Sequence, residues 1–267
     1  MDNLVFSNML HRPARTLVSI TGIAIGVLLI VFTVGLTNGS LREQGKREAN
    51  VGAELFFCAS GSSCLGGAGS FQLPVSTRNS SVVPLGQVSV DANTATGKRL
   101  VDGIVFDEYA KMSGIQIVEG RQFEPNADEV IVDTAFQRQE KLKIGSTLKI
   151  WERDFKVAGF YEPASGARIK MPLLTMQKQI LGAESSAEEL AKVSSFLIKI
   201  KPGYSEDQVG ENIQKVFEKN QLILTKDIPE LYLNSLPALN IFLNVIIGVA
   251  ATISALVILL TMYTTVT

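Results

Sequence analysis

Side chains that commonly take part in catalysis are few and scattered in this chain. The single histidine, His11, lies near the N-terminus. A Ser-His-Asp or Cys-His system further along the chain would therefore have no imidazole to use. Acidic neighbours such as Asp107 with Glu108 are usually solvated surface groups. The sequence predicts no catalytic residue and no enzyme activity, although residue types alone leave a glycosidase-type carboxylate pair open.

Two glycine-containing segments fail the requirements of a nucleotide site. Residues 61–70 (GSSCLGGAGS) lack the Lys and the Ser or Thr that must follow the last glycine of a phosphate loop. Gly97-Lys98 is followed by Arg99 and lacks the upstream glycine. No H-E-x-x-H zinc motif and no aspartate-rich calcium loop occur. We therefore predict no cofactor and no metal site, and a mobile surface loop at 61–70.

The two cysteines are Cys58 and Cys64, in the sequence CASGSSC. No companion His or Cys pair is present to complete a zinc site around them. Outside the cytoplasm, where conditions are oxidising, the two cysteines can form a disulfide that closes a small loop. Two free thiols are the alternative.

These residues lie in a chain whose two ends are strongly apolar. Residues 17–36 and 239–263 contain no Asp, Glu, Lys or Arg. An α-helix needs about 20 residues to cross a hydrocarbon core of about 30 Å. We therefore predict transmembrane helices at 16–37 and 238–264, with a domain at 38–236 between them. The first run exceeds the roughly 7–15 residues of a signal-peptide core, which favours an uncleaved anchor over a signal peptide.

The charges before the first apolar run predict its orientation. Arg12 and Arg15 lie next to the membrane, so the N-terminus is expected in the cytoplasm and the middle domain outside it. Residues 1–15 are predicted to form an amphipathic interfacial helix that Pro13 breaks or bends.

Small residues in the first run predict a packing surface. Gly22 and Gly26 lie four residues apart, and this spacing lets two membrane helices approach closely.

Neither apolar run carries an ionisable side chain. Ion-coupled carriers usually need such groups inside the membrane, so their absence argues against that class.

The middle domain has a strand-rich part followed by a β-α-β part. Gly145-Ser146 and Arg153-Asp154 are predicted connections between strands. In the second part, Ser205 is expected to cap a helix with Gln208 as its capping-box partner, and the β-α-β order implies a small mixed sheet. The predicted class is α+β, with two transmembrane helices flanking a mixed α/β extracytoplasmic domain. Strands are predicted at 101–106, 129–132, 147–151, 155–161, 194–201 and 222–225, with a helix at 134–142.

The overall charge excludes one class of partner. The 267 residues include 25 basic and 26 acidic side chains. Such a mixed surface has no basic footprint for nucleic acid.

Several stretches resemble the MacB/FtsX-type permeases of ABC transporters. Residues 3–27 (NLVFSNMLHRPARTLVSITGIAIGV) are similar to the first membrane segment of that family. The stretches VGAELFF, VEGRQF (with Gly120 and Arg121), DEVIVDTAF, LKIGSTLKI and DFKVAGFYE follow in the order of its outer domain. The final LVILLTMYTTVT resembles its second span. The family pattern G-I-x-I-G is matched by Gly22, Ile23, Ile25 and Gly26, after Arg15.

The resemblance implies a permease subunit in the bacterial inner (plasma) membrane, with ATP bound by a separate ABC ATPase subunit. Two permease subunits would pair, as a homo- or heterodimer among membrane lipids. They would transmit force to outer domains that export or release peptides, lipoproteins or antibiotics. Members of the family have four spans, so a chain ending after the second is expected to be a truncated or split permease.

A different class of protein remains as an alternative. Two spans around an extracytoplasmic domain also fit a membrane sensor or adhesion protein whose outer domain binds a ligand. A membrane-tethered extracellular enzyme is a third candidate.

Overall fold

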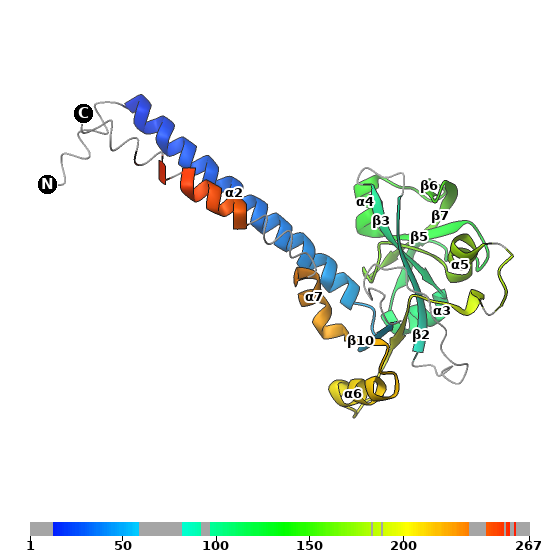
Figure 1. Ribbon diagram of the computed structural model, residues 1–267. Helices are drawn as coiled ribbons and strands as arrows, with labels where there is room; N and C mark the ends of the chain where they lie inside the picture. Colours follow the sequence, from blue (N-terminus) through cyan, green and yellow to red (C-terminus); the bar gives the residue numbers. More distant parts are fainter. Residues whose placement is uncertain are drawn as a thin grey trace. The chain divides into compact units, whose positions relative to one another are not determined.

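The computed structural model describes residues 13–58, 82–91, 97–182, 184–187, 189–234, 244–253, 255–256 and 259. The chain forms two compact units, which are described separately below. One is Gln44–Pro229, and the other combines the segments before and after it. Residues 1–12 of the predicted interfacial helix and the predicted loop at 61–70 lie outside the described residues. Figure 1 gives the order of the elements along the chain.

The first apolar run lies within one long helix, α2 (Pro13–Ala49). Proline is favoured at the first position of a helix, where its missing N–H is not needed. The part Ile20–Ala49 is long and apolar enough to cross a membrane, with a mean hydropathy of 2.4 in its most apolar window. Large side chains such as Leu28 are exposed along it, as a lipid-facing surface would be. The helix continues past the apolar run and ends at Ala49.

The second apolar run is described in part. Asn244–Ile253 is an apolar helix, shorter than a membrane crossing requires. Much of the predicted span at 238–264 lies outside the described residues. A second crossing therefore stays a prediction.

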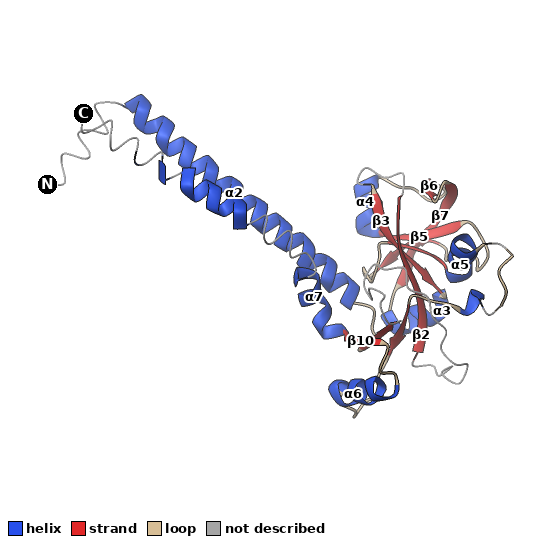
Figure 2. Ribbon diagram, in the orientation of Figure 1, coloured by secondary structure: helices blue, strands red, loops and turns tan. Residues whose placement is uncertain are grey.

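In the unit Gln44–Pro229, the described strands form one mixed sheet (Figures 1 and 2). Their bounds are β1 Leu55–Cys58, β2 Val82–Asp91, β3 Lys98–Ile104, β4 Gln116–Gly120, β5 Glu129–Asp133, β6 Thr147–Ile150, β7 Arg153–Glu162, β8 Ile169–Pro172, β9 Ser195–Ile198 and β10 Gln221–Leu224. The order is β10-β1-β9-β2-β3-β8-β5-β7-β4, and β6 also pairs with β7. The pairs β3–β8 and β5–β7 are parallel, and the other described pairs are antiparallel.

The described helices that follow α2 are short. They are α3 Phe106–Ser113, α4 Thr134–Glu140, α5 Leu173–Leu181, α6 Glu206–Val216 and α7 Ile228–Asn234, with 3-10 turns at Glu189–Ala191 and Thr225–Asp227.

The mixed α/β class is confirmed, but the two predicted parts share one sheet. The β-α-β part was expected to build a small sheet of its own. Instead β9 pairs with β1 on one side and with β2 on the other, which joins both parts. Strand β1 also lies between β9 and β10, which α6 connects. Sequence order cannot show such an insertion.

Three local predictions need correction. The predicted strand 101–106 ends at Ile104, and the unpredicted helix α3 begins at Phe106. The turn before β7 lies at Trp151 and Glu152, whose positive φ angles of 50° and 63° reverse the chain there. Arg153 and Asp154 are already part of β7. Ser205 precedes α6 as predicted, but its side chain makes no capping hydrogen bond.

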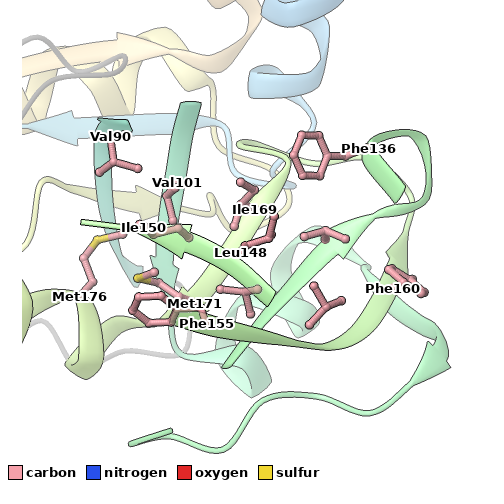
Figure 3. Close-up of a cluster of buried hydrophobic side chains, with 13 residues drawn as sticks. Val90, Val101, Phe136, Leu148, Ile150, Phe155, Phe160, Ile169, Met171 and Met176 are labelled. Carbon is pink, nitrogen blue, oxygen red and sulfur yellow. The ribbon is translucent and has the colours of Figure 1, made fainter. Parts of the chain in front are cut away.

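The apolar core lies on one face of the central strands. Alternate residues of β3 and β8, such as Val101, Ile169 and Met171, point into it together with Met176 of α5 (Figure 3). Gly103 also faces this side, because a Cβ there would lie 2.7 Å from the Met176 sulfur. The intervening residues of the same strands must then face the opposite side of the sheet. The cluster comprises Val90, Val101, Val130, Val132, Phe136, Leu148, Ile150, Phe155, Val157, Phe160, Ile169, Met171 and Met176.

Candidate functional site at the foot of helix α2

The end of α2 is part of the folded domain. We call its last residues, Gln44–Ala49, the foot of α2; they belong to the unit Gln44–Pro229. Glu48 in the foot is fully buried, and Val51 just after it is fully buried too. A helix that ended in solvent would not bury a carboxylate. The foot therefore has a specific docking position on the domain.

Directional hydrogen bonds fix the foot against the loop at 163–167. The Arg47 Nε donates to the Gly166 carbonyl at 2.8 Å, and the Gly166 N–H donates to the Arg47 carbonyl at 2.9 Å. The Asn50 side chain donates to the Ala164 carbonyl at 2.7 Å. The Arg47 carbonyl, one of the last in the helix, thus accepts from the Gly166 N–H as well as from the Asn50 N–H at 3.1 Å.

Beneath the foot lies a polar group that we call the buried cluster, formed by Gln87 of β2, Asp102 of β3 and Lys170 of β8, and Glu48 of the foot contacts it. At most 2% of each residue is exposed. The Gln87 Nε2 donates to the Glu48 Oε2 at 3.2 Å and to the Asp102 Oδ1 at 3.1 Å. The Asp102 Oδ2 accepts from the Lys170 Nζ at 2.9 Å and from the Ala167 N–H at 2.8 Å. The Gln87 side-chain amide thus links the Glu48 carboxylate to the ion pair of Asp102 and Lys170.

Two tyrosines surround the Lys170 ammonium. The Nζ lies 4.5 Å from the ring centre of Tyr109 in α3 and 5.4 Å from that of Tyr161 in β7. It also donates to the Tyr109 hydroxyl at 3.3 Å. Burial alone would lower the pKa of Lys170, but the nearby Asp102 and the tyrosines raise it well above its usual value. Lys170 therefore carries a positive charge inside the domain.

The pKa of Glu48 is raised well above its usual value. Burial, and next the negative charge of Asp102, raise the pKa of Glu48 from 4.5 to about 7. Arg47 and Lys170 act in the opposite direction but do not cancel this effect. Glu48 lies 11 residues beyond the predicted membrane-spanning segment 16–37, and Ile20–Ala49, at 30 residues, is longer than the about 20 that a crossing needs, so Glu48 lies outside the membrane. The site can therefore position a helix and exchange a proton near neutral pH.

Gly166 is required by the space around the cluster. Its φ angle is +58°, and a Cβ there would lie 2.5 Å from the Asp102 Oδ2 and 3.3 Å from the Lys170 Nζ. Only a residue without a Cβ fits without displacing this ion pair. The loop can therefore approach both the foot and the buried cluster.

The residues that the sequence singled out lie elsewhere. Gly22 and Gly26 are in α2, and no described atom lies within 4 Å of where their Cβ atoms would be. Their packing role stays a prediction. Cys58 ends β1 and is buried, whereas Cys64 lies outside the described residues, so the disulfide also stays a prediction. Within the described part of the chain, no group of three or more His, Cys, Asp or Glu side chains could hold a metal ion.

Sequence reasoning missed the buried cluster. Asp102 interrupts the apolar run LVDGIV, and Lys170 interrupts the run IKMPLL. A charge inside a strand that is apolar on both sides is the signal that could have found them, because such a charge needs a buried partner.

The chain matches one protein family and is similar to several solved structures. A sequence model of the family described as MacB-like periplasmic core domain matches residues 16–216. No curated protein matches the chain. Among solved structures, the periplasmic region of MacB from Actinobacillus actinomycetemcomitans is similar, with 17% identity and a TM-score of 0.45 over 69% of this chain and 95% of that one. The extracellular domain of the ABC-type transporter YknZ from Gram-positive bacteria gives 16% identity and a TM-score of 0.44 over 64% and 98%.

Proposed function

This chain belongs to the family of MacB-like periplasmic core domains of ABC-type transporter permeases, and we propose that it works as a force-transmitting subunit. ATP would be bound and hydrolysed by a separate ATPase subunit in the cytoplasm. The resulting motion of the membrane helices would displace the extracytoplasmic domain. The chain itself would carry out no chemical step and would hold no cofactor.

The docked foot of α2 is the observation that supports this proposal. One uninterrupted helix carries both the apolar segment and the foot. The foot and the adjoining Asn50 are held by three hydrogen bonds to the loop at 163–167, and Glu48 of the foot contacts the buried cluster. Bonds of this kind contribute about 0.5–1.5 kcal/mol each, and about 1.5–3 kcal/mol when a charged group takes part. A tilt or shift of the helix would therefore pull the domain with it rather than slide past it.

Membership of this family suggests which partners the chain has and in which membrane it lies. We infer a second permease subunit, identical or different, which would pack along the face of Gly22 and Gly26 in the inner membrane. The N-terminus would lie in the cytoplasm and the domain outside it. Peptides, lipoproteins or antibiotics are the substrate classes that the family resemblance suggests for export or release.

A break in α2 between the membrane and the foot tests force transmission. Ser40 lies in this part of the helix and is exposed. In Ser40→Pro, the missing N–H and the clash with the preceding turn kink the helix at a cost of about 3 kcal/mol. The full chain and its ATPase would be placed in lipid nanodiscs, with a donor dye at the exposed Lys111 and acceptor dyes on the lipid headgroups. ATP should change the energy transfer in the wild type and change it by less than half as much in Ser40→Pro.

The matched control is Ser40→Ala, which keeps the helix intact and should behave as the wild type. Co-purification of the ATPase with each variant checks that assembly is unaffected. A full ATP-dependent change in Ser40→Pro, with the ATPase bound, would overturn the proposal.

A further inference from the structure

Glu48 has more hydrogen-bonding capacity than its surroundings fill. Its Oε2 accepts one bond, from Gln87. Its Oε1 is buried and has no hydrogen-bond partner within the described part of the chain. An ionised carboxylate that is buried with so few donors is far more costly than the neutral acid. The geometry of the docked foot thus favours a protonated Glu48.

The charges around Glu48 lead to the same conclusion. Asp102 of β3 and Lys170 of β8 face it from the sheet, Arg47 lies beside it on α2, and Tyr109 of α3 contacts Lys170. Lys170 is already paired with Asp102 at 2.9 Å, and the Arg47 Nε donates to the Gly166 carbonyl. With Glu48 neutral, the fully buried charges of Asp102 and Lys170 cancel. With Glu48 ionised, one buried negative charge has no fully buried counter-charge.

We propose that the foot of α2 is a proton-controlled latch: the foot stays docked while the Glu48 carboxyl holds a proton, and undocking releases that proton to water. The docked acid becomes a solvated carboxylate when the foot leaves the buried cluster, and the reverse step takes up one proton. Acid therefore holds the latch closed, and rising pH loosens it. This regulation matters for transport only if the proposed force transmission holds, but the latch itself can be measured without the ATPase.

The sign and the pH window follow from the displaced acidity. The pKa of Glu48 is about 7 in the docked foot, against the usual value of 4.5 when the carboxyl is solvated. A carboxyl whose pKa is raised by docking favours the docked state fully below pH 4.5. That advantage is lost as pH rises from 4.5 to about 7, and it changes little at higher pH. The opening equilibrium should rise on the order of 30-fold between pH 5 and pH 7.

Hydrogen exchange of single amides in the full chain can measure the latch. The Gly166 N–H is bonded to the Arg47 carbonyl and so reports docking of the foot. The Val157 N–H, bonded to the Ser146 carbonyl within the sheet region, reports global opening, so Gly166 must be less protected than Val157 if the foot opens locally. After correction for the intrinsic exchange rate, Gly166 protection should fall on the order of 30-fold from pH 5 to pH 7.

Substitution of the proton-binding group gives the decisive comparison. Glu48→Gln resembles the neutral acid, so its Gly166 protection should not depend on pH. Glu43→Gln, at an exposed position on the same helix, is the control and should keep the wild-type pH dependence. If Glu48→Gln keeps the wild-type pH dependence, or if the wild type shows none, the latch is refuted.

A second measurement covers the case in which Glu48→Gln fails to fold. The Glu48 carboxyl carbon can be followed by NMR in the wild-type chain with labelled glutamate, and it should titrate near pH 7. Titration near the ordinary value would refute the proposal. If the pH tests confirm the latch but Ser40→Pro keeps its ATP-dependent motion, the proposal of force transmission is wrong and the latch remains a property of the domain. If Ser40→Pro blocks the motion but Glu48 titrates normally, only the latch fails.

Discussion

The two faces of strands β3 and β8 differ in what they contact and in how they can change. One face presents Val101, Ile169 and Met171 to the apolar core. The other presents Asp102 and Lys170 to the foot of α2 and to α3. Because side chains alternate along a strand, neighbouring residues of the same two strands serve both purposes.

The two faces have different roles: the apolar face stabilises the sheet, and the polar face couples the sheet to α2. Apolar packing is non-directional and nearly independent of pH, so the core face holds the sheet together under all conditions. Buried polar groups are directional, and their net contribution depends on every partner being in place. A helix docked on the polar face is therefore held at one position and can be released by a change of charge. We infer that the domain keeps its permanent contacts on one face and its adjustable contacts on the other.

Removal of the buried cation should have the largest effect. Lys170→Met keeps most of the side-chain volume but leaves Asp102 buried without its counter-charge, which should cost about 3–5 kcal/mol of unfolding free energy. Trp151 is the single tryptophan and packs against the apolar core, so its fluorescence reports urea unfolding of the full chain in detergent. The loss should be larger at pH 8 than at pH 5, because Lys170 lowers the pKa of Glu48 and its removal makes an ionised Glu48 more costly at pH 8.

Two control variants test whether this behaviour belongs to the polar face. Met171→Ala, one residue along on the core face, should cost about 2–4 kcal/mol through the cavity it leaves, with equal losses at both pH values. Lys149→Met removes an exposed lysine paired with Glu152 and should leave the unfolding free energy nearly unchanged at both pH values. If Lys170→Met and Met171→Ala respond to pH alike, the proposed difference between the faces is wrong.

A methyl group at Gly166 should give the next largest effect. Gly166→Ala must accept a positive φ and also displace Asp102 or Lys170, at a total of about 2–3 kcal/mol. Gly145→Ala is the matched control, since Gly145 has a φ of +81° but open space around its Cβ position. It should cost only the conformational part, about 1–2 kcal/mol. Equal unfolding free energies for the two variants would show that the approach of the loop to the cluster is not tight.

Local patterns in the sequence predicted much of the fold but little of the site. The predicted strand 129–132 and the predicted helix 134–142 correspond to β5 and α4, because their signals are contained in a few neighbouring residues. The order of strands in the sheet depends instead on pairings between distant segments, such as β2 with β9. Turn residues and periodicity carry no information about such pairings.

The buried cluster could not be assembled from sequence for the same reason. Asp102 and Lys170 are 68 residues apart and meet because β3 and β8 pair in parallel. Glu48 lies in α2 beyond the predicted span 16–37, and nothing in the neighbouring sequence indicates what the helix contacts there. Asp102 and Lys170 were each detectable as a charge within an apolar strand, but their partners follow from the topology alone.

Loss of the Arg47 side chain should give the smallest effect and the sharpest test of the foot. Arg47→Met removes the bond to the Gly166 carbonyl but keeps the backbone bond from the Gly166 N–H to the Arg47 carbonyl. Unfolding free energy should fall by only about 1 kcal/mol, because one hydrogen bond is lost at a partly buried position. Protection of the Gly166 amide should fall about fivefold, because the lost bond holds the docked foot, and protection of the Val157 amide should fall by a similar factor where it exchanges through global unfolding. Arg42→Met, at an exposed position earlier on α2, should change neither quantity. If the Gly166 amide were as strongly protected as the Val157 amide in both the wild type and Arg47→Met, the foot would open only with the whole domain, and the polar face could not act as an adjustable contact.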